Sequence, residues 1–318
     1  MHPILKLTAQ RFALGILLLF AASAMLFGLT EALPGDAAQA VLGQSATPEA
    51  LENLRKEMGL DRPAVTRYFD WLGGMLQGDL GTALTNKKDI AESIGKRLGN
   101  TIFLAFWAAL ISVPLAIFLG LLAVRYQNRW PDKAISAVTL TTISVPEFLI
   151  GYVLMFFISV RLGWAPSVAM ISDNMSLGTK LNAIALPIAV LTMVVLAHMM
   201  RMTRAAILNV MQSAYVETAE LKGLSTFNVI FRHAFPNAIA PIVNVVMLNL
   251  AYLVVGVVVV EVVFVYPGMG QYLVDHVVKR DVPVVLASGV VFAAIYIFLN
   301  MTADIVSILA NPRLRHPK

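Results

Sequence analysis

The chain contains no cysteine and carries little charge for its length. Its 318 residues include 24 Lys and Arg and 19 Asp and Glu, together 14% of the total. Without cysteine, disulfide bonds and thiolate metal sites are excluded. Residues of the AVILMFWYC set make up 58% of the chain and the mean hydropathy is +0.75, whereas a soluble domain of this size is far more charged. These values indicate an integral membrane protein.

Several functional signatures are also missing. No Gly-x-x-x-x-Gly-Lys-Ser/Thr phosphate loop occurs, so we expect that the chain is not an enzyme and does not itself hydrolyse ATP. No pair of histidines or acids has metal-ligand spacing, and we predict no metal site. The net charge of +5 is interpreted as an asymmetry between membrane loops, and no nucleic-acid partner is expected.

Six segments are long and apolar enough to cross a membrane: 12–31, 101–124, 135–160, 184–208, 238–263 and 284–310. A hydrocarbon core about 30 Å thick needs roughly 20 apolar residues in a helix, and lipid leaves backbone groups no partner outside the segment. The first segment follows two basic residues as a signal peptide would, but its length and a poor cleavage context favour an uncleaved helix. The expected fold is all-α with six transmembrane helices.

Basic residues predict the orientation of these spans. They concentrate at the N-terminus, after the second span, around the loop after the fourth span and at the C-terminus, which all fall on one side of a six-span topology. That side is cytoplasmic by the positive-inside rule, so the predicted topology is N-in, C-in. The residues are Lys6, Arg11, Arg125, Arg129, Lys133, Arg201, Arg204, Lys222, Arg232, Arg313, Arg315 and Lys318.

Residues 34–99 form a long external segment, interpreted as a helical cap on the outer surface. Thr47 followed by Pro48 and Glu49 begins a helix that ends at Gly59. A second amphipathic stretch, 65–75, places Tyr68, Trp71 and Leu72 on one face, which suits a membrane interface. We therefore divide the chain into a tail and first span (1–33), the cap (34–99), a five-span core (100–310) that includes the cytoplasmic segment 213–236, and a cytoplasmic tail (311–318).

The segment 214–236 is a polar connector between the fourth and fifth spans. A short helix is expected to end at Gly223, because glycine tolerates positive φ. Ser225 then caps a second helix, and Pro236 lies in the first turn of the fifth span. The apolar face of the second helix comprises Phe227, Ile230, Phe231 and Ala234.

The small residues Thr218, Ala219 and Gly223 would let the surface of another protein approach closely. A solvated amphipathic connector explains the same residues, and the residues alone leave both interpretations open.

This segment resembles the cytoplasmic signature of ABC importer permeases: Glu-Ala-Ala, three residues, Gly, nine residues, then Ile-x-Leu-Pro. The chain has Glu217-Thr218-Ala219, three residues, Gly223, nine residues, then 233–236, His-Ala-Phe-Pro. Its departures at the Thr, His and Phe positions resemble the dipeptide/oligopeptide/nickel branch. In that branch Tyr-Val-x-Thr-Ala-x-x-Lys-Gly-Leu-Ser and Arg-His-Ala-x-x-Asn are usual, and 215–225 and 232–237 match them.

The resemblance covers nearly the whole chain. Further matches are Leu-Pro-Gly-Asp at 33–36, and the stretches 58–63, 78–82, 97–98, 144–148, 162–166, 266–270 and 311–315. The pattern is similar to the first of the two paired permeases in a dipeptide-type, binding-protein-dependent importer of the bacterial inner membrane. The resemblance implies a type I importer permease fold and translocation of peptides or related small solutes. The resemblance does not select a substrate among dipeptides, oligopeptides, nickel chelates, glutathione and opines.

The resemblance also implies the partners: a homologous second permease forming a heterodimer, two cytoplasmic ATPase subunits, an external binding protein and membrane lipid. The chain itself is expected to bind no cofactor, because ATP and Mg are used by the ATPase subunits. The residues implied in ATPase coupling are Tyr215, Glu217, Thr218, Ala219, Lys222, Gly223, Leu224, Ser225, Phe235 and Pro236.

Ionisable residues within the spans support an alternative hypothesis, a proton- or ion-coupled secondary transporter. They are Glu261, Asp304 and His198, and ionisable groups at depth often mark ion pathways. Helix packing or an interfacial position explains them as well.

Prolines also interrupt four spans, at 114, 146, 187 and 241; simple kinks or a translocation path both explain these breaks. The residues predicted to line such a path are Ser144, Pro146, Asn244 and Asn249.

Overall fold

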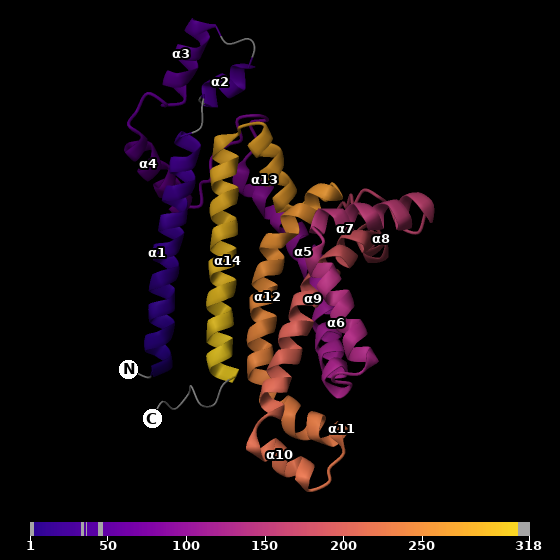
Figure 1. Cartoon of the computed structure of the whole chain (residues 1–318). Helices are drawn as coiled ribbons and strands as arrows, with labels where there is room; N and C mark the ends of the chain where they lie inside the picture. Colours follow the sequence, from indigo (N-terminus) through magenta and orange to yellow (C-terminus); the bar gives the residue numbers. More distant parts are fainter. Residues whose placement is uncertain (1–2, 33–34, 36, 44–46, 311–318) are drawn as a thin grey trace. The chain divides into compact units, whose positions relative to one another are not determined.

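The computed structural model describes residues 3–32, 35, 37–43 and 47–310, which are mostly helical, with turns and loops between the helices and one isolated bridge between Thr82 and Asp89 (Figure 1). The motif at 311–315, and that at 33–36 except for Gly35, lie outside the described residues. The elements are α1 Pro3–Glu31, α2 Ala37–Leu42, α3 Pro48–Glu57, α4 Ala64–Leu76, α5 Ile90–Arg125, α6 Trp130–Ser144, α7 Glu147–Leu154, η2 Met155–Arg161, α8 Leu177–Ala183, α9 Ala185–Met211, α10 Ala214–Leu221, α11 Thr226–Asn228, η3 Val229–Ala234, α12 Phe235–Val263, α13 Met269–Val278 and α14 Val282–Ala310.

The described residues contain five helices long and apolar enough to cross a membrane, or six if a bent pair forms one span. The five candidate spans are Thr8–Glu31, Ile90–Arg125, Ala185–Met211, Thr226–Val254 and Val282–Val306. Each overlaps one of the predicted segments, with the largest displacement at Thr226–Val254 against 238–263, so the multi-pass helical architecture is confirmed. Orientation and the four-part division of the sequence stay predictions.

The third predicted span, 135–160, is broken rather than continuous. Helices α6 and α7 meet at an angle of 104°, with Val145 in an extended conformation between them. Pro146 explains the break, because proline offers no N–H and disfavours the α conformation in the residue before it. The chain beyond α7 continues as the π-helical segment η2. The predicted span is therefore two helices that meet at Pro146, whereas a simple kink would leave one bent helix.

The other three prolines do not break their helices. Pro114 and Pro241 lie inside the continuous helices α5 and α12. Pro187 lies in the first turn of α9, where the N–H of a residue has no helical partner to lose. The expectation that all four prolines interrupt spans is correct only for Pro146.

Helix α5 begins at Ile90, well before the predicted start of the second span at 101. Asp89 explains the early start, because its Oδ1 accepts the backbone N–H of Glu92 at 2.8 Å and its carbonyl accepts the hydroxyl of Ser93 at 2.8 Å. The 36 residues of α5 span about 54 Å at 1.5 Å per residue, which exceeds the hydrocarbon core. The end of the predicted cap is thus part of a transmembrane helix.

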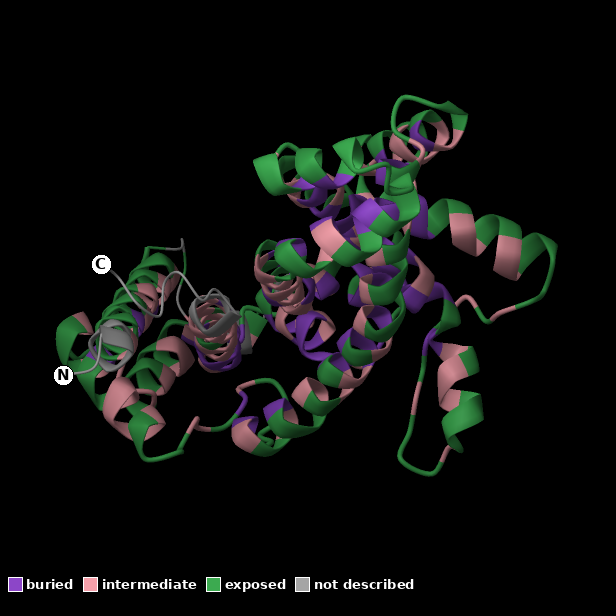
Figure 2. Cartoon of the chain, turned by 90° about the horizontal axis from the view of Figure 1, so that it is seen from below, coloured by how far each residue is buried: buried purple, intermediate pink, exposed green. Residues whose placement is uncertain are grey.

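The chain divides into two compact units, of which the first comprises Met1–Phe12, Ile102–Tyr266 and Phe298–Lys318. Its main core surrounds α9, which packs against α12, α6 and α7, and buried positions gather where these helices meet (Figure 2). Gly120 of α5 permits a close approach to α9, because a Cβ there would lie 2.9 Å from Cγ2 of Thr203. Outward faces are apolar and exposed, as at Phe106, Phe118 and Val138, which suits contact with lipid or partner helices.

The second unit comprises Ala13–Thr101 and Pro267–Ile297. Tyr68 of α4 packs edge-on against Phe27 of α1 and shares a 2.8 Å hydrogen bond between its hydroxyl and that of Ser23. The predicted face of 65–75 is therefore present, but Tyr68 packs on α1, whereas an interfacial position was predicted. Thr47 caps α3 by accepting the N–H of Ala50 at 3.3 Å, as predicted.

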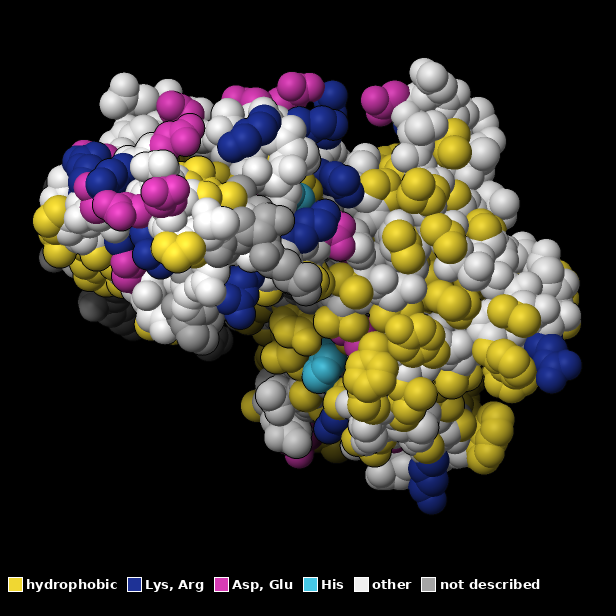
Figure 3. All heavy atoms as spheres, turned by 90° about the horizontal axis from the view of Figure 1, so that it is seen from above, with side chains coloured by type: hydrophobic (Ala, Val, Ile, Leu, Met, Phe, Trp, Pro, Cys, Tyr) yellow, Lys and Arg dark blue, Asp and Glu magenta, His cyan; other side chains and the backbone are white. Residues whose placement is uncertain are grey.

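Charges of both signs are intermingled on the face seen from above in Figure 3. Ion pairs among the described residues of the second unit include Lys56–Glu52, Arg62–Asp70, Arg67–Glu31 and Lys96–Glu92.

Candidate functional site

The connector between α9 and α12 folds as two short helical pieces, α10 and α11, which lie together beyond the ends of α9 and α12 (Figure 1). Helix α10 ends as predicted, because Gly223 adopts a φ of +79°. The N–H of Leu224 then donates to the carbonyl of Ala219 at 3.3 Å. No atom lies within 4 Å of the position of a Cβ at Gly223, so the backbone conformation alone requires glycine there.

The second helix is capped by Ser225, whose hydroxyl accepts the N–H of Asn228 at 3.4 Å. From there α11, the π-helical segment η3 and α12 follow without a break. Pro236 lies in the first turn of α12. The cap at Ser225 and the position of Pro236 are both confirmed, and the continuous backbone joins the connector rigidly to the fifth span.

One face of α10 packs inward. Val216 and Ala219 are buried against Val229 of η3 and Met211 of α9. Ala219 is only 5% exposed, so its small side chain serves the packing of the chain on itself. Thr218 and Gly223 are exposed, and the approach of another protein to this helix stays a prediction.

The other face of the connector is exposed and partly apolar. Leu221, at the end of α10, is 83% exposed. Phe227 and Phe231 are also exposed and stack on each other with ring centroids 4.4 Å apart, while the guanidinium of Arg125 lies over the Phe227 ring. The predicted apolar face is therefore split, because Ile230 and Ala234 are buried and the two phenylalanines are not.

We define the connector surface as the exposed residues of 215–231. Of the residues implied in ATPase coupling, those exposed are Tyr215, Glu217, Thr218, Lys222, Gly223, Leu224, Ser225 and Pro236; Phe235 is half-buried and Ala219 is buried. Leu221, Phe227 and Phe231 belong to the same surface and were not among the predicted site residues. The signal that identifies them is the presence of large apolar side chains within this otherwise polar connector.

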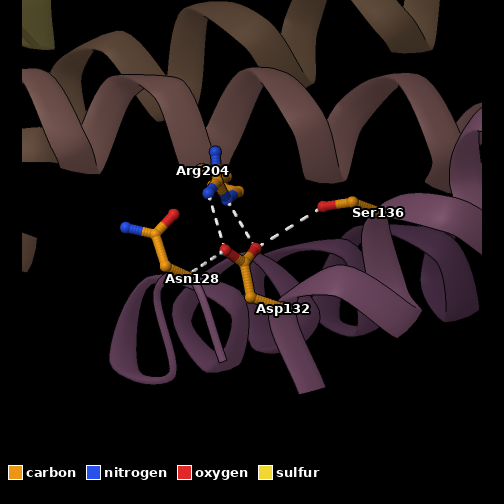
Figure 4. Close-up of polar contacts among 4 residues, drawn as sticks. All are labelled: Asn128, Asp132, Ser136 and Arg204. Atoms are coloured by element: carbon orange, nitrogen blue, oxygen red, sulfur yellow. Dashed lines mark hydrogen bonds and ion pairs between the residues drawn. The ribbon is translucent and has the colours of Figure 1, made fainter. Parts of the chain in front are cut away.

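A charged clamp holds α6 to α9 in the same unit (Figure 4). Arg204 donates from Nε to Oδ1 of Asp132 at 2.9 Å and from Nη2 to Oδ2 at 2.8 Å. Asp132 is 4% exposed, and its Oδ2 also accepts the N–H of Asn128 at 2.9 Å, which holds the turn between α5 and α6. The bidentate geometry is the strongest form of a charge-assisted hydrogen bond. Sequence reasoning counted Arg204 only for orientation and missed its partner.

The residues predicted to line a translocation path lie on two different segments. Ser144 and Pro146 are exposed at the break between α6 and α7, and the Ser144 hydroxyl donates to the carbonyl of Leu140. Asn244 and Asn249 lie on α12, the first half-buried and the second buried. The Asn249 side chain donates to the carbonyl of Val245 at 2.8 Å, within its own helix.

The ionisable residues of the secondary-transporter hypothesis have different surroundings. Asp304 forms an ion pair with Arg11 at 3.0 Å, which explains an acid in the sixth span without an ion pathway. Glu261 is fully buried on α12 and His198 is exposed on α9. No group of three or more His, Asp or Glu residues is arranged to hold a metal ion in the described part of the chain.

Family models match almost the entire sequence. Residues 112–316 match the model described as binding-protein-dependent transport system inner membrane component, and residues 4–105 match its N-terminal counterpart. A protein of Brucella abortus (strain 2308) named as a peptide transport system permease is 33% identical over 310 residues, covering 98% of this chain and 99% of its own. The glutathione transport system permease GsiC of Escherichia coli (strain K12) is 33% identical over 298 residues, covering 94% and 95%.

Among solved structures, a chain of the MetNI methionine ABC transporter in an inward-facing conformation covers 70% of this chain and 96% of its own. It is 17% identical with a TM-score of 0.48. The family models and the two relatives carry the assignment by themselves. The chain belongs to the binding-protein-dependent transport system inner membrane components: it is a multi-pass permease subunit of an ABC importer of the peptide type.

Proposed function

We propose that this permease translocates short peptides or related small solutes, and that partner ATPases drive it through the connector surface. The observation that carries the proposal is the exposed apolar Leu221, which stands at the end of a helix that is itself fixed to two spans. Leu221 and the stacked, exposed pair Phe227 and Phe231 give the connector surface several exposed apolar side chains, which fits a contact with another protein.

The packing of α10 explains how force would reach the membrane. Val216 and Ala219 hold α10 against α9 and η3, and η3 continues into α12. The clamp between Asp132 and Arg204 then joins α9 to α6. A displacement of α10 by a moving ATPase is therefore passed to three helices, as alternating access by rigid-body motion requires.

The chain supplies no ATP site in this proposal, and ATP and Mg are bound by two partner ATPases. The family places an ATPase and a binding protein in such systems in general. We propose in addition a homologous second permease, this chain being the first of the pair, with the translocation path between them. Ser144 and Pro146 at the α6–α7 break, and Asn244 and Asn249 on α12, are the proposed path residues.

The substrate class rests on the relatives. One is named for peptide transport and another for transport of glutathione, which is itself a short peptide. A small peptide is therefore the simplest shared chemistry, with nickel chelates and opines as less supported members of the same branch.

The test is a charge reversal on the connector surface. Glu217→Lys places a positive charge beside the proposed contact, and Glu57→Lys makes the same change at an exposed position of α3. In cells that produce the whole transport system, we expect Glu217→Lys to abolish ATP-dependent uptake of a labelled dipeptide and of labelled glutathione while membrane insertion is retained. Glu57→Lys should leave uptake close to that of the wild type.

Gly223→Pro is the second variant, because proline cannot adopt the φ of +79°. It should uncouple ATP hydrolysis from uptake without removing the spans. If both connector variants transport as the wild type does, the coupling role is refuted.

A further inference from the structure

A second site lies between α6 and α9, apart from the connector surface. The two helices border a cavity of about 490 Å³. It is lined by Ser136, Leu140, His198, Arg201, Met202, Arg204 and Ala205. The connector surface contributes no residue to it, so the site does not depend on the proposed function.

The cavity carries an excess of positive charge. Arg204 is neutralised by Asp132 through two hydrogen bonds. Arg201 is exposed and, like His198, makes no hydrogen bond or ion pair with any part of the chain that the structure describes. A guanidinium with its donors free beside a cavity is suited to bind the oxygens of a phosphate or carboxylate.

The cavity also lies at a definite level along the helices. Arg201 is 16 residues beyond the first residue of α9, or about 24 Å along the axis, and it is one of the basic residues that mark the predicted cytoplasmic end of this helix. The clamp sets the start of α6 level with Arg204, and Trp130 at that start is 78% exposed. Exposed tryptophan is typical of the boundary between lipid headgroups and acyl chains.

Two apolar side chains border the cavity beside Arg201. Leu140 of α6 is 48% exposed and Met202 of α9 is 47% exposed. The combination is a basic pocket with exposed apolar side chains in its wall. A lipid has both matching parts in one molecule, whereas a soluble anion has only the first.

We propose that this cavity binds the headgroup phosphate of an anionic phospholipid, with Arg201 as the main ligand and an acyl chain against Leu140 and Met202. The lipid then bridges α6 and α9 beside the clamp. Binding stabilises whichever arrangement of the two helices the clamp maintains.

The experiment measures thermal unfolding of the purified permease complex in detergent, with added dioleoyl phosphatidylglycerol or dioleoyl phosphatidylcholine. Phosphatidylglycerol should raise the unfolding temperature of the wild type more than phosphatidylcholine does. Arg201→Gln should raise the apparent dissociation constant for phosphatidylglycerol about tenfold, as expected when a charge-assisted hydrogen bond is lost. Arg129→Gln, at an exposed position just before α6 and outside the cavity, should respond as the wild type does.

A second variant keeps the test valid if Arg201→Gln does not fold. Met202→Glu places a carboxylate in the lining of the cavity, where it repels an anionic headgroup, and it should weaken the response to phosphatidylglycerol in the same way. Equal stabilisation by both lipids, equal loss in Arg129→Gln, or full replacement of the lipid by inorganic phosphate overturns the proposal. Loss of association with the second permease in Arg201→Gln, with the lipid response unchanged, overturns it in favour of a protein partner.

Discussion

Replacing Asp132 by Asn tests whether the clamp between α6 and α9 holds the permease together. The substitution keeps the size of the side chain but removes its charge, so that the guanidinium of Arg204 loses its bidentate partner. The N–H of Asn128 still has an oxygen to bond, which limits the change to the ion pair. Asp70→Asn is the matched control, because Asp70 pairs with Arg62 at the surface.

The two variants should differ in stability because the Asp132–Arg204 pair is largely buried and the Asp70–Arg62 pair is exposed. Removing one partner of a buried pair costs about 3–5 kcal/mol, and the lower end applies because the Arg204 side chain is 27% exposed. The Arg62–Asp70 side chains are 51% and 57% exposed, and such pairs contribute about 0.2–1 kcal/mol. At about 2–4 °C per kcal/mol for a chain of this size, Asp132→Asn should unfold roughly 6–12 °C earlier than the wild type and the control at most about 4 °C earlier.

Intrinsic tryptophan fluorescence during heating is a suitable assay, since a thiol-reactive dye has no cysteine to label. Replacing both clamp residues by apolar ones, as in Asp132→Leu with Arg204→Met, should recover most of the loss, because no buried charge is then left without a partner. If Asp132→Asn unfolds at the same temperature as Asp70→Asn, the clamp does not stabilise the packing of α6 on α9.

Three further substitutions test individual contacts. Gly120→Ala should cost about 1–3 kcal/mol by overpacking against Thr203, and Thr203→Ala in the same chain should recover part of it, as measured by thermal unfolding. Tyr68→Phe should cost about 1 kcal/mol and show coupling to Ser23→Ala in a double-mutant cycle, because the two hydroxyls share a hydrogen bond. Gly223→Ala places a Cβ on a residue with positive φ, which should lower the stability of the turn by about 1–2 kcal/mol. Trypsin should therefore cleave next to this turn faster than in the wild type, and an unchanged cleavage rate argues against strain there.

The features that local chemistry determines were predictable from the sequence. Five candidate spans match predicted segments because twenty apolar residues in lipid have no alternative to a helix. The caps at Thr47 and Ser225 and the stop at Gly223 were predicted because each depends on one side chain and its immediate backbone.

Features that depend on neighbouring helices were not predictable in the same way. The size of the bend at Pro146 reflects packing as well as the proline itself. The π-helical turn of η3 changes which side chains face inward, so that Phe227 and Phe231 lie outside and Ile230 inside. The burial of Ala219 depends on contact with Val229, ten residues further along the chain and folded back against α10.

The pairing of Asp132 with Arg204 joins residues that lie 72 positions apart. Nothing in the local pattern of a single sequence marks such a partner. The cavity beside them was missed for the same reason, because its walls come from two helices that are distant in sequence.

The central claim, that an ATPase subunit contacts the connector surface, is tested most directly by cross-linking. The absence of cysteine allows a single Leu221→Cys to be introduced, with Leu76→Cys on α4, equally exposed at 81%, as the matched control. In membranes that contain the whole transport system, a short bifunctional thiol–amine reagent should join residue 221 to an ATPase subunit and leave residue 76 unlinked to it. Cross-links to an ATPase from residue 76 alone, or from neither position, would contradict the account.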